Sequence, residues 1–307
     1  MFSIGLSSYS MLNAIEAGMS ILDVMAFAKE IGAENFELVP FGYTLYDDEK
    51  GVFDDGLINA VKEKSAELGL PLSNYAVLGD LLKPDPDARK REIERLEKHI
   101  DVAAKLGLRR MRHDVSSFRR PLETNTPLDF EREFPMMVET CQALADYAAQ
   151  YGITTTVENH GFFVNGADRV IRLYDAVDRP NFGLLLDIGN FICVEDDCCV
   201  AAAKIMKYVK MIHMKDFYIR RKDALPDLGG LFRCDSGCWF SSNSGRYMLR
   251  GSILGQGDLD IESIIKTIVD SGYDGPATVE FEGMEAPEAG SEMGVKAAKF
   301  FANKAAR

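Results

Sequence analysis

Short apolar runs alternate with longer segments in which apolar residues recur every three or four positions. The short runs predict β-strands, and the longer segments predict amphipathic helices with one buried face. The predicted strands are residues 2–7, 35–39, 72–77, 109–113, 154–157, 183–187, 209–213 and 277–280. The predicted helices are residues 21–31, 57–68, 87–106, 130–151, 167–177, 200–208, 261–271 and 294–302.

Five glycines fall just after a helical segment and just before a strand, where a helix commonly ends in a left-handed residue. They are Gly32, Gly69, Gly107, Gly152 and Gly272. This repeated order of helix, glycine and strand in an α/β chain predicts one domain over residues 1–307, a (β/α)8 TIM barrel. The alternative, an open doubly wound sheet, would usually carry a glycine-rich phosphate-binding turn after its first strand, and residues 7–10 form none. Residues 216–252, after the seventh strand, are predicted to be a long loop without regular structure.

Four side chains suited to metal binding each close one of the last four predicted strands. They are Glu158, Asp187, His213 and Glu280. Burying a charged group is costly unless it is paired, and the carboxyl ends of barrel strands converge on one face. Three carboxylates and one imidazole suit a divalent cation such as manganese or magnesium. The sequence therefore predicts a metal site at this face, although Glu282 is an alternative ligand to Glu280.

Three further residues lie beside these strand ends. His160 is two positions after Glu158 and faces the same side of an extended strand, so we expect proton transfer or substrate contact, with a structural histidine as the alternative. Asn190 is placed to bind a substrate hydroxyl. Lys215 is expected either to stabilise a substrate oxyanion or to form a salt bridge with Asp216 or another carboxylate.

Arg112 and His113, at the end of the fourth strand, are expected to bind a sugar oxygen or a carboxylate, or else to hydrogen-bond within the barrel mouth. Trp239, the single tryptophan of the chain, lies in the segment 216–252 and is expected to stack on a sugar ring or an aromatic aglycone. A long segment at the active face serves as a lid, a partner surface or a specificity element.

The formal net charge of −13 argues against a nucleic-acid partner, which requires a basic surface. No apolar run approaches the roughly 20 residues of a membrane helix, and no basic segment followed by an apolar one opens the chain. We therefore expect a cytoplasmic protein without membrane contact. The six cysteines show no disulfide framework and are expected to be free thiols; Cys234 and Cys238 have zinc-type spacing but no second ligand pair nearby.

Several motifs resemble the xylose isomerase-like TIM barrel superfamily, which includes sugar phosphate isomerases and epimerases, inosose dehydratases and endonuclease IV. They are Val-Glu-Asn-His-Gly, Leu-Asp-Ile-Gly-Asn, Ile-His-Met-Lys-Asp, Leu-Gly-Gln-Gly-Asp-Leu-Asp and Gly-Tyr-Asp-Gly-Pro-Ala-Thr-Val-Glu-Phe-Glu-Gly. The resemblance implies that Glu158, Asp187, His213 and Glu280 hold one divalent ion. Manganese is expected, with magnesium, cobalt or zinc as alternatives. The resemblance also implies that Glu158 and Glu280 form an acid/base pair on opposite faces of the substrate.

The chain departs from the ketose 3-epimerases at Asn190 and Ile219, where the resemblance would imply a histidine and an arginine. It also lacks histidines of the three-metal cluster of endonuclease IV, so DNA cleavage is not expected. The expected activity is isomerisation or epimerisation of a keto-sugar or cyclitol by proton transfer next to a carbonyl.

Two alternatives remain open at this point. One is a lyase acting on 3-oxo-sugars, similar to a C-glycoside deglycosidase catalytic subunit or an inosose dehydratase. The other is a non-catalytic sugar-binding barrel. The expected partners are a small carbohydrate and further copies of the chain, or a different subunit if the deglycosidase alternative holds.

Overall fold

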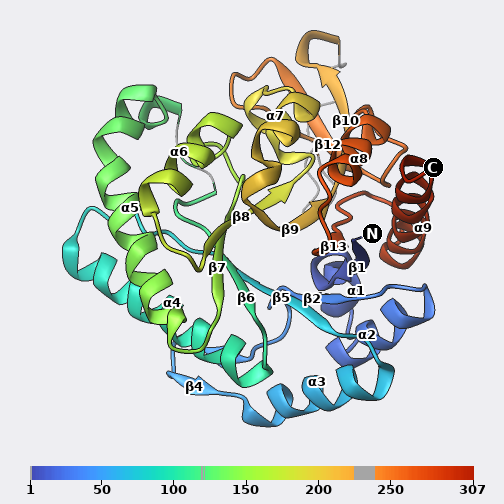
Figure 1. The fold of residues 1–307 in the computed structure, drawn as a ribbon, viewed down its shortest axis with the longest axis horizontal. Coiled ribbons are helices and arrows are strands. Elements are labelled where there is room, and N and C mark those ends of the chain that lie inside the picture. The colour runs from blue at the N-terminus through green and yellow to red at the C-terminus, as the bar shows by residue number, and fades with distance from the viewer. Residues whose placement is uncertain (1, 119, 121, 225–238) are drawn as a thin grey trace.

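The computed structural model describes residues 2–118, 120, 122–224 and 239–307, and its centre is a closed barrel of parallel strands surrounded by helices (Figure 1). Around the barrel the strands follow in chain order, so each pairs with the next and the last pairs with the first. This confirms the predicted (β/α)8 barrel and all eight of its strands. They are β1 (Ser3–Ser7), β2 (Phe36–Leu38), β5 (Leu72–Val77), β6 (Arg110–His113), β7 (Thr154–Glu158), β8 (Phe182–Asp187), β9 (Val209–Met214) and β13 (Pro276–Val279).

The predicted helical segments all form helices, which lie outside the barrel (Figure 1). The helices are α1 (Leu12–Glu16), α2 (Ile21–Glu30), α3 (Asp55–Leu68), α4 (Pro86–Leu106), α5 (Pro127–Ala149), α6 (Ala167–Val177), α7 (Cys198–Ile205), α8 (Ile261–Asp270) and α9 (Pro287–Ala305). Short 3-10 turns are η1 (Ser8–Met11), η2 (Leu122–Thr124), η3 (Asn190–Val194), η4 (Met206–Tyr208) and η5 (Lys222–Ala224). None of the helices among the described residues is long and apolar enough to cross a membrane.

Local side-chain chemistry sets where the helices begin and end. Asp54, Asp85 and Asp197 each accept hydrogen bonds from the free backbone N–H groups of the helix that follows. Gly69 and Gly107 end α3 and α4 in the left-handed region, at φ +54° and +76°. The other three glycines predicted to end helices also have positive φ, which confirms the predicted helix ends.

Strand alternation places apolar side chains under the helices and polar ones inside the carboxyl end of the barrel. On β5, Tyr75 faces outward and its hydroxyl contacts His99 Nδ1 of α4 at 2.9 Å. The preceding residue, Asn74, faces inward and donates to Glu37 of β2 at 2.8 Å. The outer layer is closed by apolar faces such as that of α8, where Ile264 and Ile268 are fully buried. The interior of the barrel mouth is therefore left for charged and polar groups.

The prediction of a loop without regular structure over residues 216–252 was wrong. Three antiparallel strands form a separate sheet there, namely β10 (Asp216–Arg221), β11 (Phe240–Ser241) and β12 (Tyr247–Ser252), in the order β10-β12-β11. Phe217 and Leu249 pack with Cys193 in a small apolar cluster below this sheet. The pattern was missed because the strands lack a regular apolar alternation: β10 is buried only at its start and ends in two arginines, and β11 has two residues. A two-stranded hairpin, β3 (Tyr46–Asp47) with β4 (Val52–Phe53), adds to the outer layer.

The four described cysteines are free thiols, as predicted: Cys141, Cys193, Cys198 and Cys199. Cys234 and Cys238, which have zinc-type spacing, lie outside the described residues.

The start of α5 offers a direct test of local stability. Thr126 Oγ1 accepts from the backbone N–H of Asp129 at 3.2 Å, and Asp129 Oδ2 accepts from the backbone N–H of Thr126 at 3.1 Å. We expect Thr126→Ala to lower the free energy of unfolding by about 1 kcal/mol, because the backbone N–H of Asp129 loses its acceptor, while the bond from the backbone N–H of residue 126 to Asp129 remains. Urea denaturation measures this change, and Thr126→Ser, which keeps the hydroxyl, is the control. An equal loss in both variants would contradict a capping role.

Candidate metal centre and active site

The four strand-end side chains predicted as ligands meet at the carboxyl end of the barrel. Glu158 and Asp187 are the last residues of β7 and β8, His213 is the last but one of β9, and Glu280 follows β13. Each offers one ligand atom, and these atoms all lie within 4.8 Å of one another. All four residues are buried. Parallel pairing brings them together, since Asp187 stands opposite His213 in the register of β8 and β9.

Glu37 of β2 fixes the orientation of the His213 ring. Glu37 Oε1 lies 2.8 Å from His213 Nε2 and also accepts from Asn74 Nδ2, while Thr278 Oγ1 donates to Glu37 Oε2 at 3.1 Å. With Nε2 committed to this carboxylate, His213 Nδ1 points to the other ligands. It lies 3.6 Å from Glu158 Oε1 and 3.7 Å from Glu280 Oε1. A carboxylate partner of this kind orients a metal-binding histidine and increases its basicity.

Asp187 is held just as firmly. Its Oδ1 accepts from the backbone N–H groups of Gly189 at 2.8 Å and Asn190 at 2.9 Å. Asn159, which points away from the site, exchanges two hydrogen bonds with the Asp187 backbone and so ties the ends of β7 and β8 together. Asp187 Oδ2 and His213 Nδ1 are buried yet have no hydrogen-bond partner among the described residues. Buried polar atoms normally have one, so these two suit ligation, and the group fits a divalent metal site.

Lys215 lies against the same carboxylates. Its Nζ is 2.6 Å from Glu280 Oε2, 3.3 Å from Asp187 Oδ2 and 3.1 Å from Glu282 Oε1. The salt-bridge alternative predicted for this residue is thus present, with these carboxylates and not with Asp216; contact with a substrate stays a prediction. Asn190 Nδ2 donates to Glu158 Oε1 at 2.9 Å. Both side chains therefore hold the ligand carboxylates in place.

The surrounding charges and burial shift the pKa values of Glu158 and Glu280 in opposite directions. Burial opposes ionisation of Glu158, but Arg112 and His213 outweigh it and hold the pKa of Glu158 well below its ordinary value. Burial raises the pKa of Glu280, and Glu158 and Glu282 add to this against the effect of Lys215. One carboxyl is therefore held ionised while the other more readily carries a proton.

A second charged group flanks Glu158. Arg112 of β6 places Nε 2.8 Å from Glu158 Oε2 and Nη2 2.7 Å from Asp114 Oδ1. The same oxygen of Asp114 lies 3.0 Å from His160 Nδ1. Burial alone would lower the pKa of His160, but the Asp114 carboxylate raises it above its ordinary value. His160 is thus held by Asp114 at the edge of the ligand group.

A cavity of about 1140 Å³ opens above the ligand group. Of the ten predicted site residues, eight line it: Arg112, Glu158, His160, Asn190, His213, Lys215, Trp239 and Glu280. Asp187 lies beneath, fully buried.

His113 is not brought to this cavity. It is fully buried, and its Nδ1 contacts the Asp114 carbonyl at 3.1 Å. The substrate contact predicted for His113 therefore finds no support in the structure, because successive residues of β6 face opposite sides and Arg112 takes the inner one.

The family model described as xylose isomerase-like TIM barrel matches residues 25–301 of the chain. The chain belongs to the xylose isomerase-like TIM barrel family. The resemblance noted in the strand-end motifs is thereby confirmed.

Among curated relatives, an inosose dehydratase from Clostridium perfringens is 28% identical to the chain over 182 residues. That match covers 57% of the chain and 56% of the relative, so it spans little more than half of the relative's length.

Two solved structures share the fold. One is a 3-keto-D-glucoside 4-epimerase from E. coli, with a TM-score of 0.68, 16% identity and coverage of 98% and 100% of the two chains. The other is a xylose isomerase-like TIM barrel protein from Mycobacterium smegmatis in complex with magnesium, with a TM-score of 0.69, 17% identity and coverage of 99% and 97%. At these identities the likeness shows the fold alone.

The sequence left the roles of two residues in the xylose isomerase-like site unassigned. Glu37 is visible near the mouth of the second strand as a lone charge inside the apolar run Phe-Glu-Leu-Val, but nothing in the sequence indicates that it pairs with His213. Asp114 directly follows a strand, where any acidic residue is common, so the sequence carried no signal for its pairing with His160.

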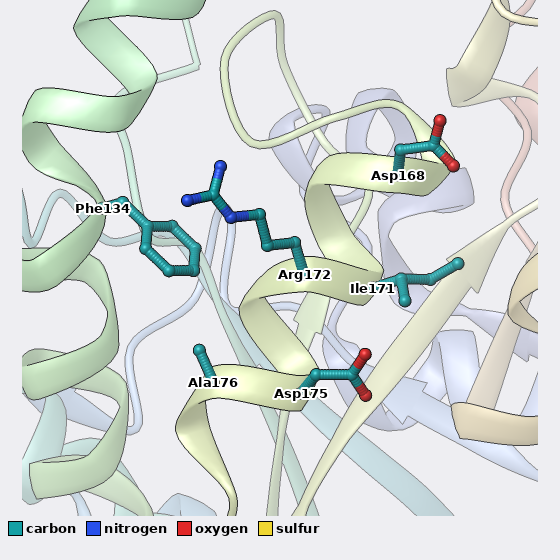
Figure 2. A pocket seen from close by; sticks show the side chains of 6 residues that line it. All are labelled: Phe134, Asp168, Ile171, Arg172, Asp175 and Ala176. Atoms are coloured by element: carbon teal, nitrogen blue, oxygen red, sulfur yellow. The ribbon is translucent and has the colours of Figure 1, made fainter.

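A second, shallower depression of about 470 Å³ lies on the outer helix layer of the barrel, beside α6 (Figure 2). Arg172 reaches across it, with its guanidinium 4.2 Å from the centre of the Phe134 ring, and pairs with Glu131. The residues lining it form no group of converging ligands such as the one at the barrel mouth.

Changing Glu37 tests the orientation of the ligand group. We expect Glu37→Gln to weaken divalent-metal affinity by about 10- to 100-fold, because His213 loses its charged partner. Isothermal titration calorimetry with Mn²⁺ measures this, and Glu63→Gln on the exposed face of α3 is the matched control. Unchanged affinity in Glu37→Gln would contradict the assigned role.

Proposed function

We propose that this protein is a divalent-metal-dependent isomerase or epimerase that moves a proton next to the carbonyl of a keto-sugar or cyclitol. The observation that carries the proposal is the buried convergence of Glu158, Asp187, His213 and Glu280 under a cavity. A divalent ion bound there, for which manganese suits the carboxylate-rich ligand set, would polarise the carbonyl and stabilise the charge that develops on its oxygen.

The two glutamates supply the proton transfers. Both line the cavity, and their environments push their pKa values in opposite directions. Such divergence is typical of an acid and a base that act in one site. In this proposal ionised Glu158 removes the C–H proton and Glu280 delivers a proton to the other face of the carbanion. Asn190 and Arg112 hold Glu158 in place while it acts.

A second candidate is elimination, in which the same carbanion expels water or another leaving group. Elimination needs a further acid to protonate the departing oxygen. His160, held by Asp114 at the cavity and with a raised pKa, has the chemistry of such an acid. The inosose dehydratases among the curated relatives also support this candidate.

Proton exchange with solvent tests the shared first step. The protein, loaded with Mn²⁺, is incubated in heavy water with inosose, ribulose and 3-oxo-glucose, and deuterium at carbon is followed by NMR. We expect exchange in at least one of them, and a loss of about 10²- to 10⁴-fold in Glu158→Gln and in Glu280→Gln. Glu63→Gln should exchange like the unaltered chain. A protein that binds these compounds but never exchanges their protons would be a sugar-binding barrel and not an enzyme.

Changing Asp114 separates the two candidates. If elimination is the reaction, Asp114→Asn should slow release of the leaving group by about 10²-fold while C–H exchange persists, because His160 loses its charged partner whereas Arg112, which also loses Asp114, keeps its pair with Glu158. If the proton is simply returned, no leaving group appears and the products are isomers. Product analysis by NMR in the same samples distinguishes these outcomes, and full leaving-group release in Asp114→Asn would remove His160 from the reaction.

A further inference from the structure

We propose that the outer part of the cavity is an aromatic-binding subsite and that the substrate is an uncharged sugar carrying an aromatic group. This inference rests on the proposed function, because it places the sugar at the ligand group. The cavity volume is the first observation. At about 1140 Å³ it exceeds the roughly 300–1,000 Å³ of pockets that enclose drug-sized ligands. A single sugar ring over the ligand carboxylates would leave much of this space unfilled.

The charges of the cavity indicate an uncharged substrate. Apart from its histidines, the described residues that line it include three cations, Arg112, Arg120 and Lys215. Each is already ion-paired with carboxylates: Arg112 with Asp114 and Glu158, Arg120 with Glu133, and Lys215 with Asp187, Glu280 and Glu282. A phosphate group would have to break one of these pairs and would also face the lining carboxylates. A neutral sugar meets neither cost.

Aromatic rings surround the remaining space. Phe118 lies 4.8 Å from the His160 ring and 5.7 Å from Phe162, centre to centre. From the small sheet, Phe240 packs edge-on against Phe217 at 5.8 Å, next to Trp239. Phe118, Phe162, Trp239 and Phe240 are half-buried, so apolar ring surface faces the cavity. Such surface in a concave site favours a flat apolar ligand, which stacks on the rings as water leaves.

The small sheet holds two of these rings in a fixed position. Gly251 of β12 packs so closely on the turn after β13 that a Cβ there would lie 2.3 Å from the Glu282 carbonyl oxygen. On its other side, Glu195 accepts hydrogen bonds from Ser242 and Ser244. The sheet adds nothing to the ligand group, so its contribution to the site is the aromatic lining.

The single tryptophan allows a test that needs no catalysis. Methyl and phenyl β-D-glucopyranoside lack a ketone and do not react, so their affinities report binding only. We expect titration with the phenyl glucoside to change Trp239 fluorescence and, by calorimetry, to bind about tenfold or more tightly than the methyl glucoside. Glucose 6-phosphate should bind no better than the methyl glucoside.

Substitutions locate the subsite. Phe118→Ala and Phe240→Ala should each reduce the phenyl-to-methyl affinity ratio severalfold, whereas Phe300→Ala, on the exposed face of α9, should leave it unchanged. Equal affinities for the two glucosides, or tighter binding of the phosphate, would overturn the inference. A phenyl preference without deuterium exchange in any ketone would keep the subsite and reject the proposed function. Deuterium exchange without a preference for the phenyl glucoside would keep the proposed function and reject the subsite.

Discussion

Compensation of buried negative charge is the constraint on which the rest of this site depends. Among the described residues, six buried carboxylates crowd the carboxyl end of the barrel against two buried cations, Arg112 and Lys215; they are Glu37, Asp114, Glu158, Asp187, Asp216 and Glu280. Burying ionised groups is expensive unless they are paired, so the excess negative charge favours protonation of His213, His160 or Glu280, or a bound cation. The carboxylates, above all that of Glu37, raise the pKa of His213 against the effect of burial. A divalent ion would replace that proton and satisfy the same carboxylates.

The barrel makes this concentration of charge possible because the charged side chains and the groups that hold them come from several different strands. Neighbouring groups fix the ligand side chains: Glu37 of β2 fixes His213, and the backbone N–H of Gly189 donates to the Asp187 side chain, while Asn159 of the loop after β7 binds the Asp187 backbone. Among the described residues, the small sheet of β10, β11 and β12 supplies no ligand. It packs on the elements that carry them: Phe217 of β10 lies close against Gly189, whose turn holds Asp187, and Gly251 of β12 lies against Glu282 after Glu280.

The sequence was sufficient for the barrel and for the ligand group, because both leave strong local signals. Apolar runs closed by a charged residue marked Glu158, Asp187, His213 and Glu280, and glycines marked the helix ends. It was insufficient for features decided by tertiary contact. Whether His113 faces the cavity depends on which side of β6 turns inward, and the pairing of Asp114 with His160 joins residues 46 positions apart. The small sheet was not predicted because its strands are buried mainly at one end and show no regular apolar alternation.

The most direct test of the central claim is an anomalous difference map from a crystal of the protein grown with Mn²⁺. The account predicts one strong peak at the carboxyl end of the barrel, about 2.2 Å from one atom each of Glu158, Asp187, His213 and Glu280. The ligating nitrogen of His213 should be Nδ1, with Nε2 still facing Glu37. A map without a peak at these side chains, or with manganese bound only elsewhere, would contradict the claim that they form a metal centre.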